Sequence, residues 1–501
     1  MKEFKLKIGL IKWFFLLPLL TIISCTDLEP VFEDTVLQED ELGNFSGIPN
    51  PKDFLEQTLY SGKMGEFGDQ ANTYAMQTVA SDESVVVTRG ADWGDNGVWR
   101  NLHQHNWRTD HPFLLRAWNR RNQAVFLCTQ LMAPATSTTD AIKAQAQALR
   151  ALNMFFVMDM FGQVPFREVD EGIDVNPRVF SRTEAFDFIV KDLMEALPNL
   201  PEAGTGADSN IANKGWAYFL LAKLYLNKEI YTGSADASDF TKVVENVDAL
   251  TNAGYSVNED YFSIFKPKEE NQELIATVNT WTGNRVWNVL HPNQGGWNGF
   301  ATLAEVYDSF EDEDIRRGVP SSPEVGFGSG LLIGQQYDAE GNKLTDRQGA
   351  DLVFTKDFPG GLLRNNERTG VRLFKYSNTG DDGNPAPANN YVLMRYSDAV
   401  LMKAEAIMRG GSSSETAVQI LDNHRTIRGA AALGSYSMED ISNERRRELY
   451  AEGWRRNDQV RFGNFSSTWD MKDNTEDFRV LYPIPLNAVA TNPNLVQNPG
   501  Y

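Results

Sequence analysis

The chain has 501 residues, a formal net charge of −21 and only two cysteines. A chain of this length buries a sizeable core without disulfide bonds, and an acidic surface disfavours nucleic acid and anionic lipid as charge-held partners. These numbers predict a globular protein that binds no nucleic acid and whose ligand is neutral; the alternative is an anionic ligand held by a local basic patch.

Residues 1–24 are predicted to be a lipoprotein signal peptide. Four lysines precede an apolar stretch at 13–23, and Ser24 directly precedes Cys25. This stretch of 11 residues is about half as long as a bilayer-crossing helix, which needs roughly 20. We expect acylation of Cys25, since two or more acyl chains anchor a protein stably. The alternative is a plain signal peptide with a chance cysteine.

Residues 25–50 are acidic and poor in apolar side chains, so they are predicted to form an acidic tether. Loss of residues 1–24, which hold four lysines and one glutamate, takes the formal charge from −21 to −24. A single domain is expected to follow the tether at 51–501. Cys128 then has no partner for an intramolecular disulfide, so this domain must depend on its core.

Helices are predicted where apolar residues recur at three- and four-residue steps. The helix after Ser181 begins with a capping-box spacing to Glu184. Paired helices with short turns indicate tetratricopeptide-like repeats, although their 34-residue period is degenerate. By pattern alone the chain is all-α with large loop insertions. The predicted helices lie at 113–131, 149–160, 186–197, 212–231, 391–409 and 415–428, with Gly410 and Gly411 as the turn between the last two.

The carboxyl terminus is predicted to be an extended tail over the domain surface. Prolines, asparagines and a glycine punctuate it, in LYPIP at 481–485 and NPGY at 498–501. Such a segment cannot continue a helix.

Several motifs spread over the chain resemble those of the SusD/RagB family of outer-membrane, glycan-binding lipoproteins. A family-like stretch, CTDLEP, follows the signal peptide, and a long helix runs into MFGQVP, with Gln163 where aspartate is usual. An arginine-rich helix and the terminal NPGY complete the resemblance. The motifs lie at 25–30, 149–165, 185–201, 444–463 and 498–501.

The resemblance implies a mostly α, SusD-like fold in which four tetratricopeptide-type repeat units are wrapped by a loop-rich region with little β-structure. The repeat helices are expected at about 111–253 and 391–457, and the loop-rich, ligand-binding part at about 64–110 and 260–390. It also implies a non-catalytic glycan receptor without a cofactor. Such a receptor is lipid-anchored at the outer membrane, faces the extracellular side and passes oligosaccharide to a SusC-like TonB-dependent transporter.

The arginine-rich motif ERRREL at 444–449 is interpreted as structural. Glu444, Glu448 and Glu452 are spaced four apart and would repel one another on a helix unless cations lie between them. Arg445 and Arg455 are expected to supply those cations. The functional alternative is an arginine clamp for phosphate or carboxylate.

The candidate binding chemistry lies in two tryptophan-rich windows, at 93–118 and 281–297, which hold seven of the ten tryptophans after residue 24. Glycines beside Trp93 and Trp297 predict turns that hold an indole out of the core. An indole stacks on the apolar C–H face of a sugar while polar groups bond its hydroxyls. The predicted ligand-binding residues are Trp93, Trp99, Asn101, Trp281, Trp287, Trp297, Arg89 and Asn284, with Asp92, Asn96 and Asn298 as further polar partners. The alternative for each tryptophan is a loop pinned to the core, which is the interpretation preferred for Trp118.

No metal site is predicted. His103 and His105 offer two ligands, whereas a zinc site needs three or four. The acidic run at 308–314 lacks the glycine and the ligand spacing of an EF-hand loop. Two other functions stay open: a glycoside hydrolase, which needs two carboxylates facing a sugar, and a helical-repeat adaptor that binds protein.

Overall fold

Helices dominate the part of the chain that the structure describes, as the apolar periodicity predicts. The structure is a computed structural model that describes residues 45–172, 174–204, 208–266, 271–280, 283–377 and 390–501. Cys25 and the predicted signal peptide therefore lie outside the described residues. The described α-helices are α1 (Pro51–Asp53), α2 (Asn72–Thr78), α3 (Val98–His103), α4 (Pro112–Met132), α5 (Asp140–Phe161), α6 (Arg182–Ala196), α7 (Lys214–Leu226), α8 (Lys228–Thr232), α9 (Ala237–Asn252), α10 (Gly283–Trp287), α11 (Ala304–Asp308), α12 (Tyr396–Met408), α13 (Ala417–Ile427), α14 (Met438–Leu449), α15 (Arg455–Phe462) and α16 (Leu486–Thr491).

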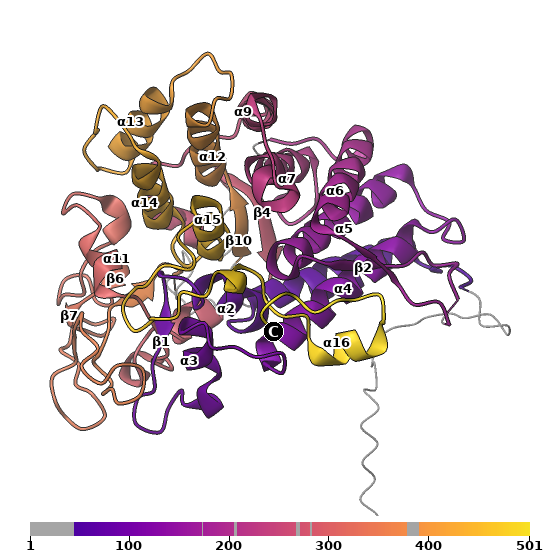
Figure 1. Cartoon of the computed structure of the whole chain (residues 1–501). Coiled ribbons are helices and arrows are strands. Elements are labelled where there is room, and N and C mark those ends of the chain that lie inside the picture. Colours follow the sequence, from indigo (N-terminus) through magenta and orange to yellow (C-terminus); the bar gives the residue numbers. More distant parts are fainter. Residues whose placement is uncertain (1–44, 173, 205–207, 267–270, 281–282, 378–389) are drawn as a thin grey trace, which may run out of the picture. The chain divides into compact units, whose positions relative to one another are not determined.

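The long helices pack against one another in a series. Helix α4 contacts α5, α5 contacts α6, and α7 and α9 lie between α6 and α12 (Figure 1). Helix α12 in turn packs on α13 and α14. This succession of neighbouring helices is the arrangement expected of helical repeats, and the mostly α architecture is confirmed.

The β-structure is limited to short antiparallel pairs in the described ranges. Five two-stranded sheets form, with the pairings β1–β5, β2–β3, β4–β10, β6–β9 and β7–β8. Several of these short pairs lie in the loop-rich region, which was predicted to hold little β-structure. The strands are β1 (Val85–Val86), β2 (Val164–Phe166), β3 (Arg178–Phe180), β4 (Leu274–Asn279), β5 (Phe300–Ala301), β6 (Gly330–Leu332), β7 (Gly334–Gln335), β8 (Val353–Phe354), β9 (Arg372–Phe374) and β10 (Asn390–Arg395).

One predicted helix begins later than expected. The sequence predicted a helix over 391–409, but Tyr391 and Val392 belong to β10 and pair with Val278 and Thr277 of β4. All side chains from Tyr391 to Arg395 are buried, and a buried run with aromatic and β-branched residues suits a strand. Helix α12 starts only at Tyr396.

Two further predicted helices differ in their bounds: α5 begins at Asp140, before the predicted 149, and the helix predicted over 212–231 is divided at Asn227 into α7 and α8. The start of α6 and the core agree with the prediction. Ser181 and Glu184 form the reciprocal capping box at the start of α6. The apolar residues that defined the helix at 149–160 are buried in the main core. Trp118 is 4% exposed, and so belongs to the core as preferred.

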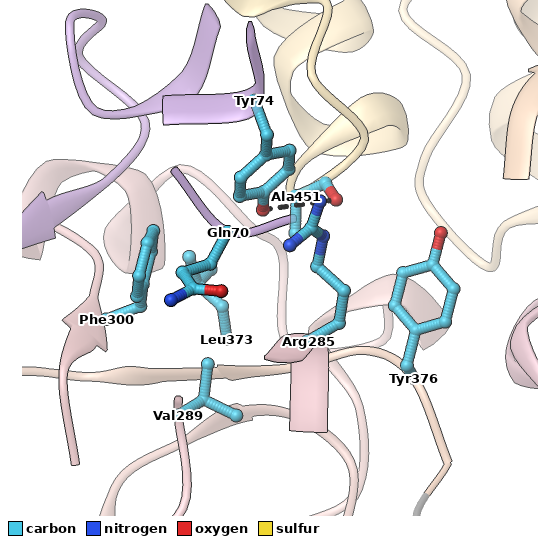
Figure 2. Close-up of a pocket in the computed structure, with 8 residues that line it drawn as sticks. All are labelled: Gln70, Tyr74, Arg285, Val289, Phe300, Leu373, Tyr376 and Ala451. Atoms are coloured by element: carbon cyan, nitrogen blue, oxygen red, sulfur yellow. Dashed lines mark hydrogen bonds between the residues drawn. The ribbon is translucent and has the colours of Figure 1, made fainter. Parts of the chain in front are cut away.

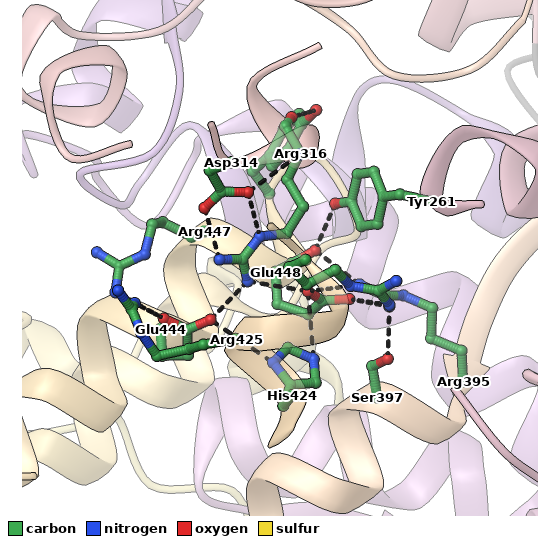
Figure 3. A network of polar contacts seen from close by, with 12 residues as sticks. Tyr261, Asp314, Arg316, Arg395, Ser397, His424, Arg425, Glu444, Arg447 and Glu448 are labelled. Carbon is green, nitrogen blue, oxygen red and sulfur yellow. Dashed lines mark hydrogen bonds and ion pairs between the residues drawn. The ribbon is translucent and has the colours of Figure 1, made fainter. Parts of the chain in front are cut away.

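The arginine-rich motif is a buried ion-pair network (Figure 3). Glu448 accepts hydrogen bonds from Arg316, Arg395 and Arg428, all fully buried. Burial alone would raise the pKa of Glu448, but Arg428 and Arg395 hold it well below its ordinary value. The structural interpretation of this motif thus has a geometric basis.

The partners of this network differ from those predicted. Arg445 pairs with Asp398 and Asp458, and Arg455 pairs with Asp82, so neither neutralises Glu448 or Glu452. The cations come instead from segments remote in sequence. Helix α14 ends at Leu449 and α15 starts at Arg455, so the predicted spacing along one continuous helix does not hold. Glu452 lies in the turn between them, where Lys375 and Arg395 bind it.

The carboxyl-terminal tail is fixed to the domain by its asparagine and tyrosine. Asn498 donates to the carbonyl oxygens of Phe161 and Tyr482, and Trp107 donates to the hydroxyl of Tyr501 at 2.7 Å. Gln163 also donates to the Asn498 side chain. The two motifs that contain Gln163 and Asn498 are therefore in contact and stabilise the fold.

Candidate functional site

Trp93, from the first tryptophan-rich window, contacts the main chain at Trp297, whose ring packs on that of Trp287 in the second window. The indole N–H of Trp93 donates to the carbonyl oxygen of Trp297 at 2.6 Å. The rings of Trp297 and Trp287 are 6.1 Å apart between centroids and inclined at 54°. Trp297 is 49% exposed, while Trp93 and Trp287 are half-buried. We call Trp93, Trp287 and Trp297 the aromatic shelf.

The turn at 291–299 presents Trp297 to solvent. His291 precedes a short 3₁₀ helix, Pro292–Gln294, and Gly295 follows it with φ +79. The chain then returns so closely that a Cβ on Gly296 would lie 2.1 Å from the carbonyl oxygen of Leu290. The glycines around Trp297 thus permit the turn that the sequence predicted.

Trp93 is supported from the interior by Trp99 and Phe300. The Trp93 ring meets those of Trp99 and Phe300 edge-on, with centroids 5.8 Å and 6.1 Å away. Trp99 is only 4% exposed, and its N–H donates to Asp95. Trp99 was predicted to contact the ligand, whereas its burial gives it a supporting position below Trp93.

Arg89 also lies inside, although it was predicted to bind ligand. It is 2% exposed, and its guanidinium donates to the carbonyl oxygens of Asn298 and Asn366, each at 2.9 Å. Burial lowers the pKa of Arg89 to about 9, partly offset by Glu367. Its main-chain contacts fix the turn that carries Trp297, so the structure gives Arg89 a positioning role.

The remaining predicted residues are placed less completely. Asn101 lies on α3, half-buried, and among the described residues no contact joins its side chain to Trp93 or Trp297. Trp281 and the side chain of Asn284 lie outside what the structure describes.

A cluster of charged and polar side chains beside the aromatic shelf was not predicted. We call it the charged clasp, and its members are Arg347, Asp92, Glu367 and His291. Arg347, which lies in the loop between β7 and β8, binds Asp92 at 2.6 Å and also Glu367. Glu367 in turn bonds the buried His291 at 2.9 Å. The clasp therefore joins the loop of Trp93 to the turn of Trp297. Its basic member lies in a polar loop outside both tryptophan-rich windows, so no sequence signal marked it.

The charges of this clasp are mutually stabilised. Burial would raise the pKa of Glu367, but hydrogen bonds from Arg347 and His291 lower it overall. Burial lowers the pKa of His291, and its Nδ1 accepts the backbone N–H of Asn293, so Nε2 carries the proton in the neutral ring. Both carboxylates are thus occupied by Arg347, a poor arrangement for acid–base attack on a glycosidic bond.

A small cavity lies beside Phe300, the residue whose ring supports Trp93 (Figure 2). Tyr74, Arg285, Phe300 and Tyr376 contribute to its wall, and the Arg285 guanidinium lies 3.4 Å from the centre of the Tyr74 ring. Its volume of about 10 Å³ suits a single water molecule. A sugar therefore does not fit in this cavity.

The two histidines weighed as metal ligands have structural partners. His103 bonds the carbonyl oxygen of Asp470, and His105 bonds that of Ala80. Burial lowers the pKa of both. Within the described ranges, no group of three or more histidine, cysteine or acidic side chains is placed to bind a metal. The described helices also include none with the length and apolarity to span a membrane.

Comparison with known proteins agrees with this architecture. The SusD family model matches residues 335–501. The starch-binding protein SusD of Bacteroides thetaiotaomicron is 26% identical, over 96% of this chain and 95% of that protein. A SusD-like protein of Bacteroides fragilis has the same fold, with a TM-score of 0.71 at 20% identity over 94% of this chain and 99% of the other.

A further solved structure shares the fold. The surface glycan-binding protein A of Bacteroides thetaiotaomicron, solved in complex with laminarihexaose, has a TM-score of 0.64 at 19% identity, over 85% of this chain and 93% of that one. The mostly helical fold of this chain is thus of the SusD-like class. The family model, the starch-binding relative and the shared fold together support a protein of the SusD/RagB family.

Proposed function

We propose that this protein is a non-catalytic surface receptor that captures oligo- or polysaccharide by stacking on the aromatic shelf. The observation that carries the proposal is the meeting of Trp93 with Trp297, which brings indoles from two distant windows together beside a half-exposed ring. Flat aromatic faces beside polar groups hold the apolar faces and the hydroxyls of sugars. The starch-binding relative and the fold neighbour bound to laminarihexaose support a glycan as the ligand.

The ligand is proposed to be neutral, as the charge of −21 suggested. At the shelf, the exposed guanidinium of Arg347 is already paired with Asp92 and Glu367. An anionic sugar would have to compete with two carboxylates for it.

The proposed setting is the outer membrane. Cys25 would carry the lipid anchor, residues 25–50 would act as the tether, and 51–501 would form one domain facing the extracellular side. The glycan would then be delivered to a SusC-like TonB-dependent transporter. Similarity to the SusD family supports this setting. The partner claim is tested by co-purification of the lipidated protein with a large outer-membrane barrel.

A carbohydrate array probed with the full-length protein in a non-glycosidic detergent tests the central claim. We expect retention on one or more neutral glycans, with a change in tryptophan fluorescence and no new reducing ends. Release of reducing ends would favour the hydrolase alternative. Absence of binding to every glycan, together with capture of a protein by the helical-repeat face, would favour the adaptor.

A further inference from the structure

Arg285, on α10, is a buried arginine without a carboxylate partner. It is 4% exposed, and its Nη2 donates to the carbonyl oxygens of Phe67 and Asp69 at 3.2 and 3.1 Å. In the part of the chain that the structure describes, no acidic side chain pairs with it, and its buried Nε and Nη1 have no hydrogen-bond acceptor. Most buried arginines in those ranges do bind a carboxylate, as Arg456 binds Asp159.

Two tyrosine rings give this guanidinium only part of what it needs. Its centre lies 3.4 Å from the centre of the Tyr74 ring and 5.1 Å from that of Tyr391. Such contacts offset some of the cost of burying a cation. The rings carry no net charge, however, so the charge of Arg285 stays uncompensated and two donors stay unpaired. Proteins satisfy buried groups of this kind with ordered water or an ion.

The small cavity described above offers room for such a partner. Arg285 lines it together with Gln70 and Tyr74, and Figure 2 shows the guanidinium turned toward these two residues. The half-buried side chain of Gln70 forms no hydrogen bond with another described residue. The Tyr74 hydroxyl donates to the carbonyl oxygen of Ala451 over a long 3.4 Å. The cavity therefore has unused donors on one side and apolar walls, Phe300 among them, on the other.

Size and charge together define the ligand that fits. The volume of about 10 Å³ admits one particle of about the size of a water molecule. Sulfate, phosphate and carboxylates are too large for it, and the guanidinium repels cations. A water molecule would accept a hydrogen bond from Arg285 but would leave its charge uncompensated. A halide ion accepts from several donors at once and also neutralises the charge.

We propose that this cavity binds one halide-sized monovalent anion, such as chloride, between the guanidinium of Arg285 and the side-chain amide of Gln70. The anion ties α10 to the segment that leads into α2, because Arg285 belongs to the first and Gln70 precedes the second. Its role is to stabilise the fold. The inference is independent of the proposed glycan binding, since neither ligand residue belongs to the aromatic shelf.

Chloride should stabilise the protein specifically. The full-length protein is kept in non-glycosidic detergent, and sodium gluconate is exchanged stepwise for sodium chloride at constant ionic strength, so that screening of the acidic surface does not change. We expect the melting temperature, followed by tryptophan fluorescence, to rise by about 1–2 °C for each tenfold increase in chloride above half-saturation, because the ion binds only the folded state. Equal melting temperatures in the two salts overturn the inference.

Crystals grown in sodium bromide locate the ion. Bromide resembles chloride in charge and nearly in size, and its anomalous scattering distinguishes it from water. We expect an anomalous difference peak in the cavity, within hydrogen-bond distance of the Arg285 guanidinium. A cavity without such a peak overturns the inference.

The variant Val289→Ile fills the cavity while Arg285 stays in place. Val289 lines the cavity and is 4% exposed, so the added methyl group competes with the ion for space. We expect the chloride-specific rise in melting temperature to fall below about a third of the wild-type rise. The matched control is Val496→Ile, at a residue 69% exposed, which should retain the full rise. A full rise in Val289→Ile would place the ion elsewhere and overturn the inference.

A second variant tests the amide ligand without filling the cavity. Gln70→Leu keeps the side chain's size but removes its donor, so the chloride concentration at which the melting temperature begins to rise should increase about threefold. Arg285→Gln is less informative, because it also loses the hydrogen bonds to the carbonyl oxygens of Phe67 and Asp69. An unchanged concentration in Gln70→Leu shows that the amide is not a ligand and rejects the proposed site.

Discussion

Trp93 and Trp297 are joined by a hydrogen bond of 2.6 Å although 204 residues separate them in the chain. The donor is the Trp93 indole and the acceptor is a main-chain carbonyl, so the contact depends on where the turn at 291–299 lies and not on the Trp297 side chain. Trp93 itself has a φ of +60, uncommon for a bulky residue. Strain of this kind persists only where the surroundings hold it, and it is frequent at binding sites.

Replacement of the exposed indole should weaken glycan binding without harming the fold. We expect Trp297→Ala to lower affinity about fivefold, equivalent to about 1 kcal/mol, because one stacking face is lost. Calorimetric titration with the best glycan from the array measures the change. Leu486→Ala, at a residue 60% exposed on α16, is the control for loss of a surface apolar group. Unchanged affinity in Trp297→Ala would remove the shelf from the binding site.

A methyl group on Gly299 should displace the Trp93 ring. A Cβ there would lie 2.4 Å from two atoms of that indole, whereas a Cβ on Gly94 would meet only the Thr88 methyl at 3.9 Å. We therefore expect Gly299→Ala to weaken glycan binding several-fold and Gly94→Ala to leave it unaltered. Affinity gels on the two variants provide the comparison, and equal retardation of both would contradict the close packing of Trp93 on Gly299.

Affinity should increase with the length of the glycan. The shelf is open to water, so a single sugar gains little, while a longer chain covers more of the inclined faces and offers repeated sites. Titrations with a series from disaccharide to hexasaccharide of one linkage measure the trend. A disaccharide that binds as tightly as the hexasaccharide would point to an enclosed site instead.

Removal of the charge on Glu448 should destabilise the domain strongly. Three fully buried arginines donate to this carboxylate, and its loss leaves their charges undercompensated. We expect Glu448→Gln to lower the free energy of unfolding by about 3–5 kcal/mol. Urea denaturation measures it, with Glu439→Gln as control because Glu439 is exposed on the same helix. A loss no larger than that of the control would refute a structural role for the network.

Glu83 should make stability fall as pH rises. It is buried, it accepts the N–H of Ala451 at 2.8 Å, and burial raises its pKa from 4.5 to about 8. The folded state therefore holds this proton more tightly than the unfolded chain, so the contribution is complete below about pH 4.5 and is lost progressively up to about pH 8.

The variant Glu83→Gln should lack this dependence. Urea unfolding of wild type and variant between about pH 5 and pH 8 gives the difference in free energy of unfolding, which should shift in favour of the variant as pH rises. Glu340→Gln, on an exposed turn, serves as the control. A difference that does not vary with pH would show that Glu83 is ionised in the fold.

Local patterns in the sequence were sufficient for most of the helices. Apolar spacing located α5 and α6, and the Ser181 capping box marked the start of α6, because both depend on neighbours within a few residues. The strand β10 was missed for the opposite reason. Its partner β4 lies more than a hundred residues away, and short apolar runs fit a helix and a strand alike.

The sequence by itself determined which residue types were available for a sugar: glycine-flanked tryptophans in two windows, in an acidic chain with family motifs from 25 to 501. Only the tertiary structure decided their roles, because burial and distance arise when remote segments pack. It placed Trp99 and Arg89 inside, left Trp297 half in solvent, and brought in Arg347, Arg372 and Glu367, which no local pattern connects to the tryptophans. The inclination of the Trp287 and Trp297 rings is likewise a property of contacts across the fold.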